Sequence, residues 1–247
     1  MNDSGPTPTL LVFTLGPECE SARRRLMPAP LQEAELRIHR QGLDAALEAG
    51  RQAGFRLVVA SPNSLDPPAD VEWIPQRGCN FAERLVGAIR SLQEKHPQAP
   101  LVVVGTDTPN LDVSYLEQAV AWLDQEPGGV VLGPSHDGGF YLLATRLALD
   151  QEFAEVRWCQ KATRSLLERA LIRNRRPVRL LTPLRDLDRP ADVEIWLYRD
   201  MQLASHLWLG RLLRALLARW KRPAVPWSME PPHLSLVPAV LSRGPPT

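Results

Sequence analysis

The segment LVVVGTDTPNL, residues 101–111, joins a strand-like run to a carboxylate. Its first four residues are apolar, which is typical of a strand buried on both faces. Gly105, Thr106 and Asp107 then follow where the chain must turn. In open α/β sheets this carboxyl end of a strand is where ligands bind. Asp107 is therefore either a turn-forming residue or a ligand for a cation such as Mg²⁺, which binds one or two carboxylates together with phosphate oxygens.

The pattern around this segment predicts an α/β fold. Apolar runs alternate with amphipathic stretches through residues 9–200, as in a sheet covered by helices on both faces. One helix is expected to start after Asn80, capped together with Glu83, and another at a capping box of Ser114 and Glu117. The predicted strands are 10–15, 56–61, 101–105, 129–133, 140–145 and 178–182.

The chain is expected to have three parts. Residues 1–200 form one domain, and residues 201–222 form an amphipathic helix with leucines beside arginines. That helix would pack on the domain or on a second copy in a homodimer, and contact with a membrane surface is the alternative. Residues 223–247 hold many of the 24 prolines, so we expect a partly disordered tail.

Composition excludes several classes of protein. With 44% hydrophobic and 23% charged residues among 247, the chain is typical of soluble globular proteins. A net charge of +1 argues against nucleic-acid binding. Cys19, Cys79 and Cys159 have no CxxC spacing, so neither a disulfide framework nor a zinc site is indicated. No apolar run approaches the ~20 residues of a membrane span. We therefore expect a soluble, unprocessed cytoplasmic protein.

Two further acidic loops follow or join predicted strands. Asp137, Gly138 and Gly139 lie between two of them, where they form either a simple hairpin turn or a place for a ligand to approach the backbone. Asp186 and Asp188 follow the last predicted strand, although Asp188 could instead cap a helix that starts with the following Arg-Pro pair. The three acidic loops together could converge on one metal site.

The ordered motifs VVVGTDTPNL, GPSHDGGFYLLA and RDLDRPAD resemble a bacterial transferase family, the selenodomain-associated transferases. Members carry GTD.PxL, DGGYYL and DxDTPED-like segments, and the match extends over about residues 9–200. PQRGCNFAERLVGAI (75–89) resembles the family's Q.G.DLGERM segment, and Trp158 is kept from its WSTxxV region. The resemblance implies a three-layer GT-A-like α/β fold, the nucleotide-diphospho-sugar transferase fold, with a mostly parallel mixed sheet covered by helices.

The resemblance weakens in FTLGPECESARRRL, residues 13–26, where members read FAKAPxPGxVKTRL. Leu15 stands at the first lysine, Glu20 at the glycine and Arg23 at the second lysine, while Arg25 matches. A carboxylate at the glycine position is expected to cost of order 1 kcal/mol beside a phosphate. The three consecutive arginines restore positive charge, unless they form only a solvated surface.

The resemblance also implies an activity and the residues that perform it. The chain would be a metal-dependent glycosyltransferase or nucleotidyltransferase acting on a nucleotide sugar or a nucleoside triphosphate, with an acceptor that the sequence does not identify. The alternative is a degenerate GT-A domain that binds a ligand or partner without catalysis. The implied roles are Mg²⁺ or Mn²⁺ binding by Asp107, Asp186 and Asp188; catalysis by Asp107, Asp137 and Arg25; nucleotide binding by Arg23, Arg25, Gln76, Arg84 and Thr106; and substrate binding by Gly138, Gly139, Tyr141 and Trp158.

Overall fold

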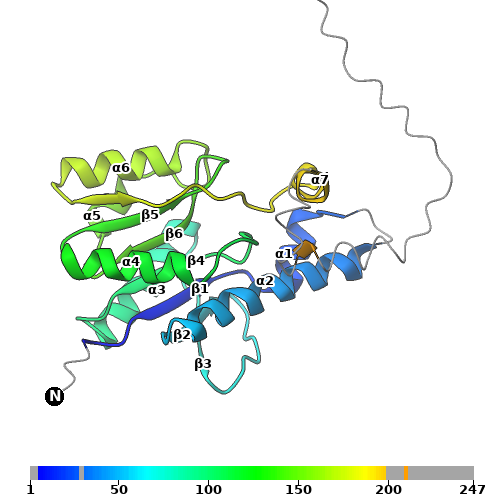
Figure 1. The fold of residues 1–247 in the computed structure, drawn as a ribbon, viewed down its shortest axis with the longest axis horizontal. Coiled ribbons are helices and arrows are strands. Elements are labelled where there is room, and N and C mark those ends of the chain that lie inside the picture. The colour runs from blue at the N-terminus through cyan, green and yellow to red at the C-terminus, as the bar shows by residue number, and fades with distance from the viewer. Residues whose placement is uncertain (1–4, 28–30, 199–208, 211–247) are drawn as a thin grey trace, which may run out of the picture.

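The computed structural model describes residues 5–27, 31–198 and 209–210, and within them a mixed seven-stranded sheet lies between helices (Figure 1). The strands are β1 (Thr9–Phe13), β2 (Arg56–Ser61), β3 (Val71–Pro75), β4 (Leu101–Val104), β5 (Val130–Pro134), β6 (Phe140–Thr145) and β7 (Val178–Leu180). The helices are α1 (Pro17–Arg24), α2 (Gln32–Gln52), α3 (Phe81–Lys95), α4 (Val113–Gln125), α5 (Asp150–Ala154), α6 (Thr163–Arg173) and α7 (Pro190–Tyr198).

The strand order is β3-β2-β1-β4-β6-β5-β7. Only β6 is reversed among these strands: it pairs antiparallel with β4 and β5, whereas the pairs β1–β2, β1–β4, β2–β3 and β5–β7 are parallel. The amino end of β6 therefore lies at the same edge of the sheet as the carboxyl ends of the other six. This confirms the expected mostly parallel mixed sheet and brings the acidic loops to one edge.

Apolar side chains cover both faces of the sheet. On β1, Leu10 and Val12 pack against α2 and α4, while Leu11 packs against the α3, α5 and α6 side, and all three are fully buried. Fully burying such a side chain stabilises the fold by about 1.5–3 kcal/mol. The apolar clusters on the two faces of the sheet thus hold in place the edge that carries the acidic loops.

The hairpin of β5 and β6 contains one irregularity. Gly133 pairs with Leu142 and Pro134 pairs with Phe140, so Tyr141 has no partner in β5. A Cβ on Gly133 would lie 2.4 Å from the Tyr141 ring, which therefore rests directly on the glycine. Such a β-bulge is a common way to re-aim a side chain beside a functional site.

Most predicted elements are confirmed, and two details are corrected. All six predicted strands are present with small shifts at their ends, but β3 is an additional strand. Asn80 caps α3 as expected, since its side chain accepts the Glu83 backbone N–H at 3.0 Å. The predicted Ser114 capping box is wrong, because Asp112 caps α4 by accepting the Ser114 N–H at 2.8 Å.

The carboxyl-terminal predictions are tested little by the structure. The expected helix at 201–222 lies outside the described residues except for Leu209 and Gly210, and the tail at 223–247 lies wholly outside them. Leu209 is buried against Trp196 and Leu26. Of the described helices, none is both long and apolar enough to cross a membrane.

Candidate active site

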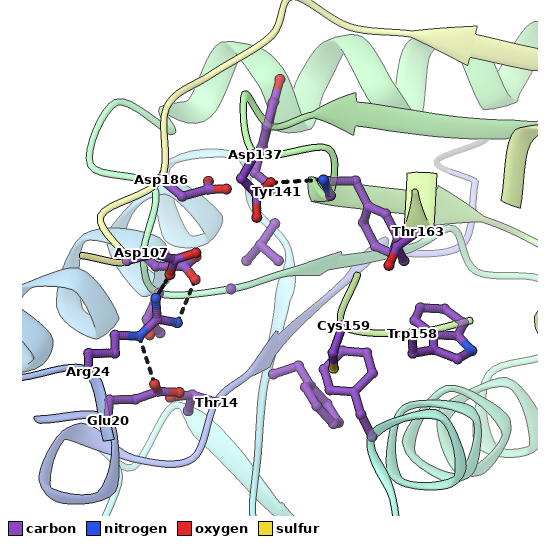
Figure 2. Close-up of a pocket in the computed structure, with 18 of the residues that line it drawn as sticks. Thr14, Glu20, Arg24, Asp107, Asp137, Tyr141, Trp158, Cys159, Thr163 and Asp186 are labelled. Atoms are coloured by element: carbon purple, nitrogen blue, oxygen red, sulfur yellow. Dashed lines mark hydrogen bonds and ion pairs between the residues drawn. The ribbon is translucent and has the colours of Figure 1, made fainter. Parts of the chain in front are cut away.

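A cavity of about 780 Å³ opens at the carboxyl edge of the sheet. Its walls come from the loops after β1 and β4, the β5–β6 turn, the segment before α6 and the residues that follow β7. Figure 2 shows Asp107, Asp137 and Asp186 on one side of this cavity and Trp158 on the other. The first side is charged and the second is aromatic.

The loop after β4 is fixed by close backbone contacts. A Cβ on Gly42 of α2 would lie 2.2 Å from the Thr106 carbonyl oxygen, so the helix can approach the loop only because it has glycine there. On its other side, the Leu187 backbone N–H donates to the Asp107 carbonyl oxygen at 2.7 Å. The Asp107 carboxylate is thereby held at the cavity.

Arg24 connects the acidic side chains around this loop. Its guanidinium donates to Glu20 at 2.9 Å and to Asp107 at 2.7 Å (Figure 2). It also forms an ion pair with Asp188. The Arg24 side chain is only 9% exposed. Burial by itself lowers the pKa of Arg24, but Asp107 and Glu20 outweigh that effect and raise the pKa above its ordinary value. Arg24 is therefore a permanent cation inside the site.

The carboxylate of Glu20 is buried and is bonded to other groups of the protein. It is 5% exposed, and its carboxylate accepts the Leu15 backbone N–H at 3.2 Å as well as the Arg24 donor. The carboxylate expected to repel a phosphate is thus paired with a cation.

The Asp137 loop is both a hairpin turn and a wall of the cavity. The Asp137 carboxylate accepts the Gly139 backbone N–H at 2.8 Å and the Ser135 hydroxyl. Gly138 has φ +96°, and a Cβ there would lie 2.0 Å from the Lys161 carbonyl oxygen. Only glycine fits this turn against the segment before α6, and the turn leaves Asp137 at the cavity.

Asp137, Asp186 and Asp188 form a carboxylate trio. One oxygen of each lies within 4.8 Å of the others, although Asp137 comes from the β5–β6 turn and the other two from the segment after β7. Asp186 also accepts the Thr108 hydroxyl at 2.9 Å. Burial raises the pKa of Asp186 to about 7, with a further contribution from the negative charge of Asp107. Converging carboxylates that are costly to ionise together fit the donor set of Mg²⁺ or Mn²⁺.

The opposite side of the cavity is aromatic. Ring centroids lie 5.5 Å apart for Phe13 and Phe81, 5.5 Å for Phe81 and Trp158, and 6.2 Å for Phe140 and Trp158. The Trp158 indole N–H donates to the Phe153 carbonyl oxygen at 3.2 Å, which fixes the ring. Phe13, Phe81, Phe140 and Trp158 come from four separate segments and are called the aromatic wall below.

The structure brings most of the residues with an expected role to the cavity. Its lining includes Arg23, Arg84, Thr106, Asp107, Asp137, Gly139, Tyr141, Trp158, Asp186 and Asp188. Gly138 lies behind the lining, against Lys161. The Tyr141 hydroxyl donates to the Thr182 carbonyl oxygen at 2.9 Å, and burial raises the pKa of Tyr141.

Besides Gly138, two residues with an expected role lie outside the lining. Arg25 is exposed at the end of α1, with φ +50°. Gln76 is buried, and its amide donates to the carbonyl oxygens of Thr14 and Ala60 at 2.8 and 2.9 Å, which ties the ends of β1 and β2 together.

Arg24 was expected only as one of three consecutive arginines, without a role of its own, and Thr108 and Ser135 were not expected at the site. Arg24 stands four residues after Glu20, a spacing that favours an ion pair on a helix, and this was the available signal. Asp188 was also a candidate helix cap, but at the start of α7 it is the Asp192 carboxylate that accepts backbone N–H groups. Asp192 accepts the backbone N–H groups of Asp188 and Arg189 at 3.0 and 2.8 Å, which leaves the Asp188 carboxylate in the trio.

Solved structures share this fold. A protein from Desulfovibrio desulfuricans G20, provisionally named a nucleotide-diphospho-sugar transferase, superposes with a TM-score of 0.73 at 18% identity, over 86% of this chain and 96% of that one. Rv0371c from Mycobacterium tuberculosis H37Rv, solved with manganese, gives 0.44 at 20% identity, over 74% and 92%. CMP:2-keto-3-deoxy-manno-octonic acid synthetase complexed with CTP gives 0.44 at 14% identity, over 86% and 98%.

The first of these structures shows that the chain has the nucleotide-diphospho-sugar transferase fold that its motifs implied. No curated protein matches the chain. A family profile described as an uncharacterized protein conserved in bacteria, DUF2064, matches residues 31–160, which is more than half of the sequence. The chain therefore belongs to the bacterial family DUF2064.

Proposed function

We propose that this protein is a metal-dependent transferase that acts on a nucleotide sugar or a nucleoside triphosphate. The observation that carries the proposal is the convergence of Asp137, Asp186 and Asp188 within 4.8 Å at the carboxyl edge of the sheet. In open α/β sheets this edge is where ligands bind. The fold shared with the Desulfovibrio protein supports the same class of function.

The carboxylates fit a divalent cation on their own chemistry. Burial and the charge of Asp107 raise the pKa of Asp186 to about 7, so ionising the whole cluster without a cation is unfavourable. Mg²⁺ or Mn²⁺ would be held by Asp186 and Asp188 with Asp137, and Asp107 lies next to them as the fourth carboxylate. Such a cation supplies stabilisation of the charge that grows on a leaving diphosphate.

Cationic side chains at the cavity would bind the phosphates. Arg23 is 60% exposed and lies 3.7 Å from Glu20, so it can turn toward a ligand. Arg84 lines the cavity, and its Nε has no hydrogen-bond partner among the described residues. Thr106 would contact the nucleotide beside Asp107. Arg25 and Gln76 would act indirectly, through the loops in which they lie.

The aromatic wall would receive the transferred group or the acceptor. Binding pockets for organic ligands are mostly apolar, with a few polar groups that fix orientation. Trp158 and Phe140 supply ring surface, and Gly139 allows close approach to the backbone. Tyr141, which is buried against Gly133, would support the turn beside them. Asp137 is the member of the trio whose loop leads into β6 and Phe140 of the aromatic wall, so it would be the carboxylate nearest the acceptor.

Glycosyl and nucleotidyl transfer need the same placement of the cation. The replacement of the resembling family's glycine and lysine by Glu20 and Leu15 favours glycosyl transfer slightly, because nucleotidyl transfer must hold a whole triphosphate. The burial of Glu20 against Arg24 favours a second candidate, a domain that binds a ligand without catalysing transfer.

Thermal unfolding tests this proposal. The protein is heated with Mn²⁺ or Mg²⁺ and a panel of nucleoside triphosphates and nucleotide sugars, beside Asp107→Ala and Asp137→Ala. A ligand at ~100 times its Kd stabilises the native state by about 2.7 kcal/mol. We expect one metal–nucleotide pair to raise the Tm of the wild type and not of these variants.

The matched control is Asp124→Ala, which changes a carboxylate paired with Arg146 at the opposite edge of the sheet. It should respond to the metal–nucleotide pair as the wild type does. No shift with any pair would refute the proposal. Release of nucleoside diphosphate or pyrophosphate would then separate the transferase from the non-catalytic candidate.

A further inference from the structure

Arg24 pairs with a carboxylate that would also hold a cation. Asp188 belongs to the carboxylate trio and is also an ion-pair partner of Arg24. The guanidinium is anchored to Glu20 at 2.9 Å and contacts Asp107 at 2.7 Å. A divalent cation held by the trio would therefore lie next to a fixed positive charge.

The positive charge of Arg24 affects the binding of a free cation and of a cation bound to a diphosphate in opposite ways. Like charges at short range repel strongly in a partly buried site, so Arg24 opposes a free divalent cation. A diphosphate brings negative oxygens, and a planar guanidinium binds phosphate oxygens with two parallel hydrogen bonds. Arg24 could release Asp188 and bind the phosphate, while the ion pair with Glu20 keeps the Arg24 side chain in place.

We propose that Arg24 makes this site selective for a divalent cation that arrives with a diphosphate, over the free cation. The inference rests on the proposed function and adds the form of the ligand: the metal–diphosphate complex. Glu20 is the positioning residue that holds Arg24 beside the trio.

Two binding measurements test the inference. Binding of free Mn²⁺ is followed by the loss of its electron paramagnetic resonance signal, and binding of the preformed Mn²⁺–pyrophosphate complex by calorimetry. For Arg24→Gln we expect the affinity for free Mn²⁺ to rise about tenfold and the affinity for the complex to fall about tenfold. A loss of structure alone would weaken both.

Two further variants separate charge from fold. Arg24→Lys keeps the charge without the planar fork, so free Mn²⁺ should bind as weakly as in the wild type while the complex binds less tightly. Arg146→Gln removes an arginine that pairs with Asp124 at the opposite edge of the sheet, and it should change neither affinity.

The outcomes distinguish this inference from the proposed function. If the wild type binds Mn²⁺–pyrophosphate and Arg24→Gln binds free Mn²⁺ no more tightly than the wild type, the selectivity role of Arg24 is wrong while the proposed function stands. If wild type and variants bind Mn²⁺ in neither form, both are wrong.

Discussion

Replacing Asp186 by asparagine should stabilise the protein at alkaline pH in the absence of metal. The pKa of Asp186 rises from 3.8 to about 7, chiefly through burial and then through the charge of Asp107. Each unit of pKa corresponds to about 1.4 kcal/mol, so ionised Asp186 destabilises the folded state by about 4 kcal/mol. Asparagine removes this charge and keeps an oxygen that can accept from Thr108.

The sign of the pH dependence follows from linkage. Between about pH 4 and pH 7 the folded protein keeps a proton that the unfolded chain has lost. The Asp186 contribution to the free energy of unfolding therefore falls as pH rises through this window and levels off above about pH 7. Urea unfolding with a chelator present should show Asp186→Asn nearly equal to the wild type near pH 4 and more stable at pH 8.

Asp188→Asn is the matched control. It also removes one carboxylate from the trio, but it breaks the ion pair with Arg24, so we expect it to destabilise the protein at pH 8. The reasoning is refuted if Asp186→Asn is less stable than the wild type at pH 8, or if the difference between them does not change with pH.

Three other perturbations have definite expected results. Gly138→Ala should cost about 2 kcal/mol or more of unfolding free energy, because its backbone is left-handed and the new Cβ meets Lys161, whereas Gly128→Ala, with open space around it, should not lower the Tm. Tyr141→Phe should cost about 1 kcal/mol in urea unfolding through loss of the hydrogen bond to Thr182. Spectroscopic titration of the wild type should show a buried tyrosine that ionises above the ordinary pKa. EDTA should abolish any Tm shift caused by a nucleotide, and excess Mn²⁺ should restore it; a shift that survives EDTA would contradict a metal-dependent site.

Local signals predicted local structure well. Runs apolar on both faces gave β1 and β4, because a strand in the middle of a covered sheet has no solvent side. The Asn80 cap depends on a residue only three positions away. β3 was missed since Glu72 and the terminal Pro75 interrupt its apolar pattern. Asp112 and Ser114 are both good capping residues, and only the direction in which the chain enters α4 selects the first.

The site itself was predicted in composition more than in arrangement. The three acidic loops were identified, but their grouping depends on β6 lying between β4 and β5, which places the Asp137 turn beside Asp186. The pairing of Arg24 with Asp107 joins residues 83 positions apart. No local pattern encodes such a contact. The resemblance implied phosphate binding by Arg23 and Arg25, the residues on either side of Arg24.

The bulge opposite Gly133 determines which ring faces which half of the molecule. Alternation along an ordinary strand would place Tyr141 on the same face of the sheet as Leu143. Because of the unpaired position, Tyr141 instead packs with Leu142 on the α2 and α4 side. Phe140 then lies on the α3 side. One extra residue in a hairpin thus gives the cavity a phenyl ring where it would otherwise have a phenol. Any side chain at position 133 would push the Tyr141 ring away. That position, which lines no part of the cavity, therefore controls the shape of its wall.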